Sequence, residues 1–257
     1  MFGATGLNES AQLLGYRSVP VSVIIRDYTY TEWTFHNPSI DAFAVVAMQT
    51  VWLARHGNRL DFVDPHWFRY ADNPYDPPLA PDGVQQAKQL AERLQGEGIE
   101  ALFASPFLRA VETAHHVAES LNLPIYIEPG LCEWLNPEWF AHRPSVLPSA
   151  ELARRFPRVD AGYRAIVEPA YPETWEEVQA RTATTITALV RDQRQILVVG
   201  HGASVVGCTW GLVGDRPAIY ADYCALVKLV LSEQCWHVEL AGDTTHIGLR
   251  SDSLHFG

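Results

Sequence analysis

The stretch TVWLARHGNR at residues 50–59 joins an apolar run to a charged turn. Residues 50–54 are almost entirely apolar, which is typical of a short buried strand. The turn that follows carries two arginines and a histidine around a glycine: Arg55, His56, Gly57 and Arg59. In open α/β sheets, ligands bind at the carboxyl ends of the strands. The stretch therefore predicts a strand of such a sheet with a ligand site at its end.

On either side of this stretch, apolar runs alternate with amphipathic segments. We expect further strands at residues 101–104, 123–127 and 195–199, and a closing hairpin at 225–231 and 235–240. Helices are predicted from Pro81, from Ser105-Pro106 to about Leu121, near 149–156, over 175–191 and from about Ala203. Residues 60–81, rich in aspartate, proline and aromatic residues, are interpreted as a long loop. The alternation predicts a three-layer α/β/α sandwich with a mostly parallel central sheet.

Residues 1–47 differ from the rest of the chain. They show no helical period and no strong caps, although residues 19–25 form a candidate strand. Met48 stands directly before the strand-like run and is a candidate start of the domain. We therefore expect residues 1–47 to be a poorly ordered N-terminal extension and residues 48–257 to be the domain that carries function.

Composition narrows the functional class. Hydrophobic residues make up 47% of the 257 residues, and the formal net charge is −11, which argues against nucleic acid or anionic membrane as a partner. The four cysteines form no CxxC pair, which favours free thiols in a reducing compartment. Residues 1–20 lack the apolar core of a signal peptide, and polar residues interrupt the apolar runs 40–54 and 196–213. These features predict a cytoplasmic protein without a membrane span.

Charged and polar side chains follow several of the predicted strands: Arg55, His56 and Arg59, then Ser105 and Arg109, then His201. Because the carboxyl ends of parallel strands share one edge, we expect these groups to converge. Guanidinium groups and helix amino termini bind phosphate dianions. A neutral imidazole in such a cluster can attack phosphorus while fixed arginines stabilise the transferred group and a carboxylic acid protonates the leaving oxygen. This chemistry needs no metal and no cofactor.

The pattern resembles the histidine phosphatase superfamily, in the branch that includes the cofactor-dependent phosphoglycerate mutases. The landmarks are Arg55-His56-Gly57, LAPDG at 79–83 with Gln86-Ala87, Ala104-Ser105-Pro106 with Arg109-Ala110 and Thr113-Ala114, Glu133, and Gly200-His201-Gly202. Within the superfamily, RHGNR at 55–59 and PGLCEW at 129–134 are similar to the phosphatase domain of the UBASH3/Sts proteins and of ecdysteroid-phosphate phosphatase. The resemblance covers about residues 50–240 and implies a phosphoglycerate mutase-like fold.

The resemblance also implies a role for each matching residue. His56 would accept the phosphoryl group and Glu133 would serve as general acid and base. Arg55, Arg109 and His201 would bind the phosphate and stabilise its transition state. Arg59 would join the phosphate pocket, and Gly202 would offer a backbone amide to the same oxygens. Asn58 departs from the related group, in which glutamate is usual. The implied function is a metal-independent phosphatase that acts on a small-molecule or peptide phosphoester.

The identity of the acid and the question of a metal stay open from the residues alone. Rival acids are Glu112, Glu138 and Asp61. His56, His201 and Glu133 have the composition of a zinc site, which three nearby arginines would disfavour by repelling a cation. His115-His116 is a poor metal clamp because neighbouring residues on a helix point apart, so we expect one at the surface and one partly packed.

The activity and the assembly stay open as well. A phosphoglycerate mutase and a phosphate-binding module without turnover are the rival functions. Several aromatic residues are candidates for a pocket wall or for a packed plug: Trp67, Phe68, Tyr70, Tyr75, Trp134, Trp139 and Phe140. The oligomeric state is undecided, with a homodimer among the states considered.

Overall fold

The computed structural model describes residues 18–25, 28–35 and 49–248. The chain divides into two units, residues 1–47 and 48–257. In the first unit, β1 (Ser18–Ile25) pairs antiparallel with β2 (Tyr28–Phe35). β1 corresponds to the candidate strand at 19–25. The expectation of poor order for residues 1–47 otherwise falls on positions outside the described residues and stays a prediction.

The second unit is built on a six-stranded sheet with the order β5-β4-β6-β3-β7-β8. Four adjacent strands are parallel: β5 (Ile125–Ile127), β4 (Ala101–Ala104), β6 (Gln195–Gly200) and β3 (Thr50–Arg55). The antiparallel hairpin of β7 (Leu226–Ser232) and β8 (Cys235–Asp243) continues the sheet beyond β3. The predicted mostly parallel sheet and its closing hairpin are therefore confirmed.

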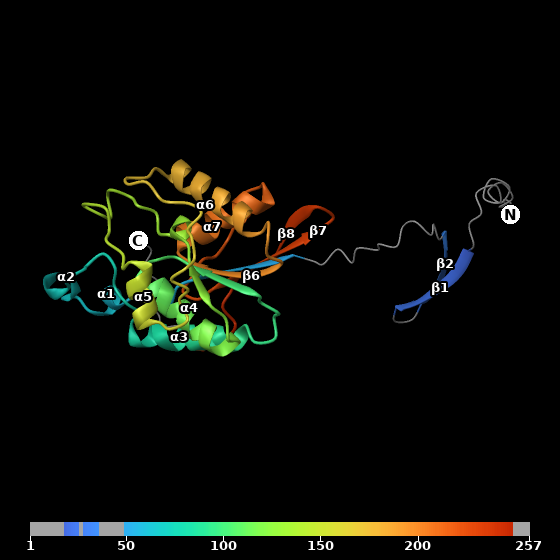
Figure 1. Cartoon of the computed structure of the whole chain (residues 1–257), viewed down its shortest axis with the longest axis horizontal. Coiled ribbons are helices and arrows are strands. Elements are labelled where there is room, and N and C mark those ends of the chain that lie inside the picture. The colour runs from blue at the N-terminus through green and yellow to red at the C-terminus, as the bar shows by residue number, and fades with distance from the viewer. Residues whose placement is uncertain (1–17, 26–27, 36–48, 249–257) are drawn as a thin grey trace. The chain divides into compact units, whose positions relative to one another are not determined.

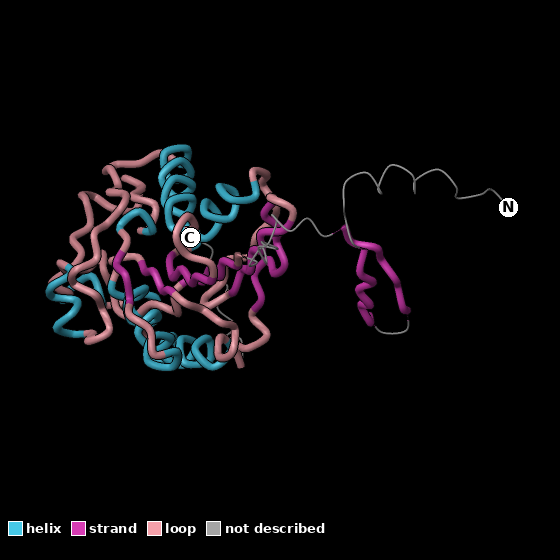
Figure 2. Tube along the Cα trace, turned by 45° about the vertical axis from the view of Figure 1, so that its right-hand side comes forward, coloured by secondary structure: helices cyan, strands magenta, loops and turns pink. Residues whose placement is uncertain are grey.

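Helices cover both faces of this sheet (Figures 1 and 2). On one side lie α3 (Pro81–Arg93) and α4 (Leu108–Leu121), with α5 (Ser149–Arg155) beside them. On the other lie α6 (Trp175–Leu189) and α7 (Gly202–Val213). Alternation along the strands divides the core: Trp52 and Ala54 pack towards α3 and α4, whereas Val51 and Leu53 pack towards α6 and α7. The expected three-layer α/β/α sandwich is confirmed.

Residues 60–81 differ from the long loop that the sequence predicted. Two short helices lie within them, α1 (Leu60–Val63) and α2 (Trp67–Tyr70), and neither contains a buried residue. Tyr70 donates a hydrogen bond to Asp64, and Trp67 Nε1 donates one to the carbonyl of Pro74. These contacts are local and polar. The two helices lack the repeating apolar positions by which a sequence pattern identifies a helix.

The start of α4 also differs from the prediction. Ser105-Pro106 has the sequence of a helix start, yet the helix begins at Leu108, and its backbone amide is bound by Asp76 Oδ1 at 2.7 Å. Ser105 Oγ instead lies 2.8 Å from His201 Nε2. A carboxylate from a distant segment therefore binds the first helical amide, while Ser105 Oγ accepts from the Phe107 amide at 3.3 Å as well as contacting His201.

Most remaining boundaries shift by one or two residues, and β8 ends at Asp243, three residues beyond the predicted end at 240. β5 begins at Ile125 rather than residue 123, and α6 ends at Leu189 rather than residue 191. A short 3₁₀ helix, η2 (Pro129–Leu131), follows β5. Among the described residues, none of the helices has the length and apolar content that crossing a bilayer requires.

Candidate active site

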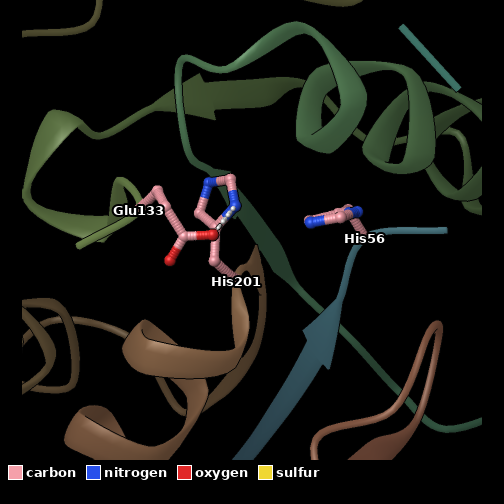
Figure 3. Close-up of side chains that lie close together, drawn as sticks. All are labelled: His56, Glu133 and His201. Atoms are coloured by element: carbon pink, nitrogen blue, oxygen red, sulfur yellow. Dashed lines mark ion pairs between the residues drawn. The ribbon is translucent and has the colours of Figure 1, made fainter. Parts of the chain in front are cut away.

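The polar groups that follow the strands meet at the carboxyl edge of the sheet. His56 comes directly after β3, Glu133 comes shortly after η2, and His201 comes directly after β6. Figure 3 shows the three side chains pointing into one space from these separate elements. The ring centroids of His56 and His201 are 5.1 Å apart. The crossover topology therefore brings together residues that lie far apart in the sequence.

His56 is fully buried, and its two ring nitrogens have different partners. Nδ1 lies 2.6 Å from the carbonyl oxygen of Gly57, to which it can only donate, and Arg109 Nε donates to Nε2 at 3.2 Å. Burial, with the charges of Arg109 and Arg55, holds the pKa of His56 well below its usual range. The imidazole is therefore neutral at pH 7, with its proton on Nδ1 and its lone pair on Nε2.

The turn that carries His56 is fixed by close packing against α3. A Cβ on Gly57 would lie 2.6 Å from the carbonyl oxygen of Gly83, so only glycine fits. The Gly57 amide donates to Thr113 Oγ1 at 3.1 Å, and the Asn58 amide donates to Gln86 Oε1 at 2.8 Å. Gly57, Gly83, Gln86 and Thr113, which belong to the motifs noted in the sequence, thus fix the backbone around His56.

Asn58, which departs from the related group, takes part in the same support. Its side-chain amide donates to Asp82 Oδ2 at 2.7 Å, and its Oδ1 accepts from the Arg59 amide at 2.9 Å. The side chain is buried and makes these contacts with neighbouring chain segments. In this structure, Asn58 therefore anchors the turn to the first turn of α3.

Arg109 and Arg55 bring guanidinium donors to the two histidines. Arg109 is 1% exposed, and its Nη2 lies 3.2 Å from His201 Nδ1. Arg55 Nη1 donates to the carbonyl of Ala221, and its guanidinium lies 4.4 Å above the ring of Tyr223. Among the described residues, Arg109 Nη1 and Arg55 Nε are buried without a hydrogen-bond partner. Guanidinium donors of this kind are suited to binding an anion.

Arg59 is held differently from the other two arginines. Its guanidinium pairs with Asp61, with Nε 2.9 Å from Oδ1, and it lies over the ring of Phe62. Its charge nevertheless contributes to lowering the pKa of both site histidines. A direct contact between Arg59 and phosphate stays a prediction.

His201 is buried between Ser105, Arg109 and Glu133. Burial, followed by the charge of Arg109, lowers its pKa well below the usual range, so the ring is neutral. Since Arg109 donates to Nδ1, the proton lies on Nε2 and is donated to Ser105 Oγ at 2.8 Å. Gly202 follows as the first residue of α7, where a Cβ would meet no atom within 4 Å. The role of the Gly202 amide in phosphate binding stays a prediction.

Glu133 is the carboxylate that lies beside both histidine and arginine. Its Oε2 is 3.4 Å from His201 Nδ1, the contact drawn as a dashed line in Figure 3, and 3.6 Å from Arg109 Nη2. Of the rival acids, Asp61 pairs with Arg59, and Glu138 is exposed outside this cluster. Glu112 Oε2 accepts from the Leu79 amide at 2.6 Å. The geometry therefore favours Glu133 as the acid.

Glu112 has a separate consequence for stability. Burial raises its pKa to about 7, so ionisation at neutral pH is unfavourable in the folded state. The penalty is absent below the unfolded pKa of 4.5, grows as pH rises, and is complete above about 7. We expect Glu112→Gln to raise the melting temperature at pH 8 by roughly 3–6 °C and to leave it unchanged at pH 4.5. A calorimetric pH series that shows equal differences at both pH values would contradict this assignment.

The only candidate metal site among the described residues is the group His56, Glu133 and His201, whose ligand atoms lie within 4.8 Å of one another. Arg109 contacts all three side chains, and its charge opposes cation binding. The expectation that no metal is needed stays a prediction. The other histidine pair is corrected in one respect: His115 and His116 are both half-buried, rather than one lying at the surface.

The aromatic residues do not form one continuous wall. Phe140 and Tyr75 pack with Phe107, whose ring centroid is 5.2 Å from that of His201. Phe68, Tyr70 and Trp139 are largely exposed. The sequence did not single out Tyr223, although its ring lies beside both His56 and Arg55. No motif precedes Tyr223, so this contact becomes visible only in the folded chain.

Comparison with known proteins identifies the family of the chain. The family model of the histidine phosphatase superfamily (branch 1) matches residues 51–244. The chain belongs to that superfamily. Human ubiquitin-associated and SH3 domain-containing protein A is 29% identical over 233 residues, which cover 74% of this chain and 35% of that protein. The transcription factor tau 55 kDa subunit of Saccharomyces cerevisiae is 39% identical over 190 residues, 67% of this chain and 43% of that protein.

A solved structure shows the shared fold. The ecdysone phosphate phosphatase of Bombyx mori, in complex with tungstate, has a TM-score of 0.64 and 23% sequence identity, and the match covers 81% of this chain and 98% of that one. This histidine phosphatase superfamily chain spans about a third to two fifths of the length of the two curated relatives named above. The resemblance predicted from the sequence is thus confirmed at the level of family and fold.

Proposed function

We propose that this chain is a metal-independent phosphatase that hydrolyses a phosphate monoester through a phosphohistidine on His56. The observation that carries the proposal is the state of His56: a neutral imidazole whose Nε2 lies against Arg109, beside buried guanidinium donors without partners. A neutral nitrogen lone pair is the attacking group that phosphoryl transfer to histidine requires. The substrate class proposed is a small-molecule or peptide phosphoester.

In the first step, His56 Nε2 forms a bond to phosphorus as the bond to the leaving oxygen breaks. Arg109, which lies against Nε2 before the reaction, and Arg55 would then bind the equatorial oxygens. The carbonyl of Gly57 holds the Nδ1 proton and stabilises the charge that the ring acquires. Glu133, as a carboxylic acid, gives its proton to the leaving oxygen, so an alcohol departs.

In the second step, water attacks the phosphorus of the phosphohistidine. The Glu133 carboxylate takes a proton from that water while the bond between phosphorus and Nε2 breaks. Inorganic phosphate is released, and His56 and Glu133 return to their starting states. Every step uses groups within the cluster around His201 and Arg109.

The assignment of Glu133 is tested by the dependence of rate on the leaving group. We expect Glu133→Gln to lower kcat/KM for an alkyl phosphate by about 10²–10³-fold, because a poor leaving group needs the proton. For 4-nitrophenyl phosphate, whose phenolate leaves without a proton, the loss should stay below about tenfold. A phosphate-release assay on a graded series of esters measures both values. Equal losses on the two substrates would show that Glu133 is not the acid.

The same assays separate the rival functions. Incubation with 3-phosphoglycerate and its bisphosphate primer should release phosphate, whereas isomerisation without release would indicate a mutase. Binding of phosphoesters without release across a broad panel would indicate a binding module. Turnover should continue in EDTA, and its loss there would contradict a metal-independent mechanism.

A further inference from the structure

A buried ion pair at the N-terminal half of α6 binds the segment that carries Glu133. Arg181 on α6 is 7% exposed, and Glu173, just before this helix, is 4% exposed. Arg181 Nε donates to Glu173 Oε1 at 2.6 Å, and Nη2 donates to Oε2 at 2.9 Å. This two-point contact fixes the plane of the guanidinium group.

The other donors of Arg181 bind the backbone that leads to Glu133. Nη1 donates to the carbonyl of Gly130 at 2.8 Å and to that of Cys132 at 3.2 Å. Nη2 also donates to the carbonyl of Glu133 itself at 3.3 Å. A guanidinium has five N–H donors, and all five have an acceptor here. Three of them are used to hold residues 130–133.

Glu173 holds the chain on the other side of Glu133. Its Oε2 accepts from the Leu135 amide at 3.3 Å, and its own amide donates to the Leu135 carbonyl at 3.1 Å. Its backbone carbonyl accepts from Trp134 Nε1 at 2.8 Å. The residues before and after Glu133 are therefore bound to the same buried pair.

A buried ion pair is a weak source of stability, because removing both charges from water costs about as much as their attraction returns. Such a pair is suited to fixing a geometry. The Glu133 carboxylate has to stay at its observed separations, 3.4 Å from His201 Nδ1 and 3.6 Å from Arg109 Nη2, to deliver a proton at the reacting oxygen. Misplacement by about 1 Å can lower a rate by about 10²-fold.

We propose that Arg181 and Glu173 are positioning residues for the general acid: they set the place of Glu133 without touching the substrate. This inference rests on the proposed function, in which Glu133 protonates the leaving oxygen. The inference gives α6 a role in catalysis. Arg181 acts through the backbone carbonyls of residues 130, 132 and 133, to which it donates hydrogen bonds. Lysine at position 181 would keep the charge but could not supply the fork that binds Glu173 and the carbonyls together.

The test is the leaving-group series applied to Arg181→Lys, with Glu133→Gln as reference. We expect kcat/KM of Arg181→Lys to fall by about 10–100-fold for an alkyl phosphate and by less than about threefold for 4-nitrophenyl phosphate. The double variant with Glu133→Gln should lose little more than Glu133→Gln alone, because both changes act on the same proton transfer. Leu90→Ala, at a buried core position on α3, serves as the stability control and should show no leaving-group dependence.

Different outcomes overturn different claims. If the loss of kcat/KM in Glu133→Gln depends strongly on the leaving group but the loss in Arg181→Lys does not, the positioning role is wrong and the proposed function stands. If the loss of kcat/KM in Glu133→Gln does not depend on the leaving group, the acid assignment fails and the positioning role fails with it. Should Arg181→Lys not fold, Glu173→Gln provides the second variant, since it keeps the shape of the side chain and removes its charge. If the loss of kcat/KM in that variant did not depend on the leaving group, the proposal would equally be overturned.

Discussion

Replacing His56 with alanine is expected to lower kcat/KM for 4-nitrophenyl phosphate by at least about 10⁴-fold. The change removes the group proposed to bond to phosphorus, and covalent catalysis does not survive loss of its nucleophile. Glu133, Arg109 and Arg55 would remain, so residual turnover would reflect electrostatic stabilisation of water attack alone. Steady-state assays of phosphate release over several hours measure the difference.

His237→Ala is the matched control, because this histidine is exposed on β8, the edge strand of the sheet. It should keep full activity. Circular dichroism and binding of inorganic phosphate would show that His56→Ala still folds and still presents its arginines. If a folded His56→Ala variant retained more than about 1% of the turnover, covalent catalysis by this residue would be ruled out.

The second large effect is expected for Arg109→Gln. Arg109 contacts His56, His201 and Glu133 and has a buried unpaired Nη1, so its loss removes the main preorganised donor. We expect kcat/KM to fall by about 10³-fold or more, since a single such donor is worth about 10²–10³. Steady-state kinetics with 4-nitrophenyl phosphate measure this loss.

A pH profile provides a second readout of the same variant. After burial, the Arg109 charge is the largest cause that lowers the pKa of His56, so removing it raises that pKa. Protonated imidazole has no lone pair at Nε2, and the acidic limb of kcat/KM should move to higher pH. Arg93→Gln, which removes a partly exposed ion pair with Glu97, is the control. An unchanged profile together with a loss below tenfold would contradict the role assigned to Arg109.

Much of the fold follows from local sequence patterns. The buried strands β3, β4 and β6 were predicted within one residue at each end, because continuous apolar runs bounded by charged or glycine residues leave little choice. The helix at Pro81 follows from its amphipathic period. Convergence of His56, Arg109 and His201 follows from topology alone, because all three come after parallel strands.

Other features depend on contacts between distant segments and have no local signal. The cap of α4 comes from Asp76, more than thirty residues before the helix start. The choice of Glu133 over Glu112 rests on distances to His201 and Arg109, which a sequence does not contain. In the sequence, nothing distinguishes Arg181 from other polar residues of a helix. Its role depends on the hydrogen bonds to the carbonyls of Gly130 and Cys132, which form only in the folded chain.

The central claim is that phosphorus becomes bonded to His56 during turnover. Rapid quench of the wild-type chain with a ³²P-labelled phosphoester, followed by peptide mapping, tests this most directly. We expect a labelled intermediate that is stable in base, labile in acid, located on the peptide that contains His56, and absent from His56→Ala. Turnover with no such adduct within the first catalytic cycle, or an adduct on any other residue, would contradict the claim.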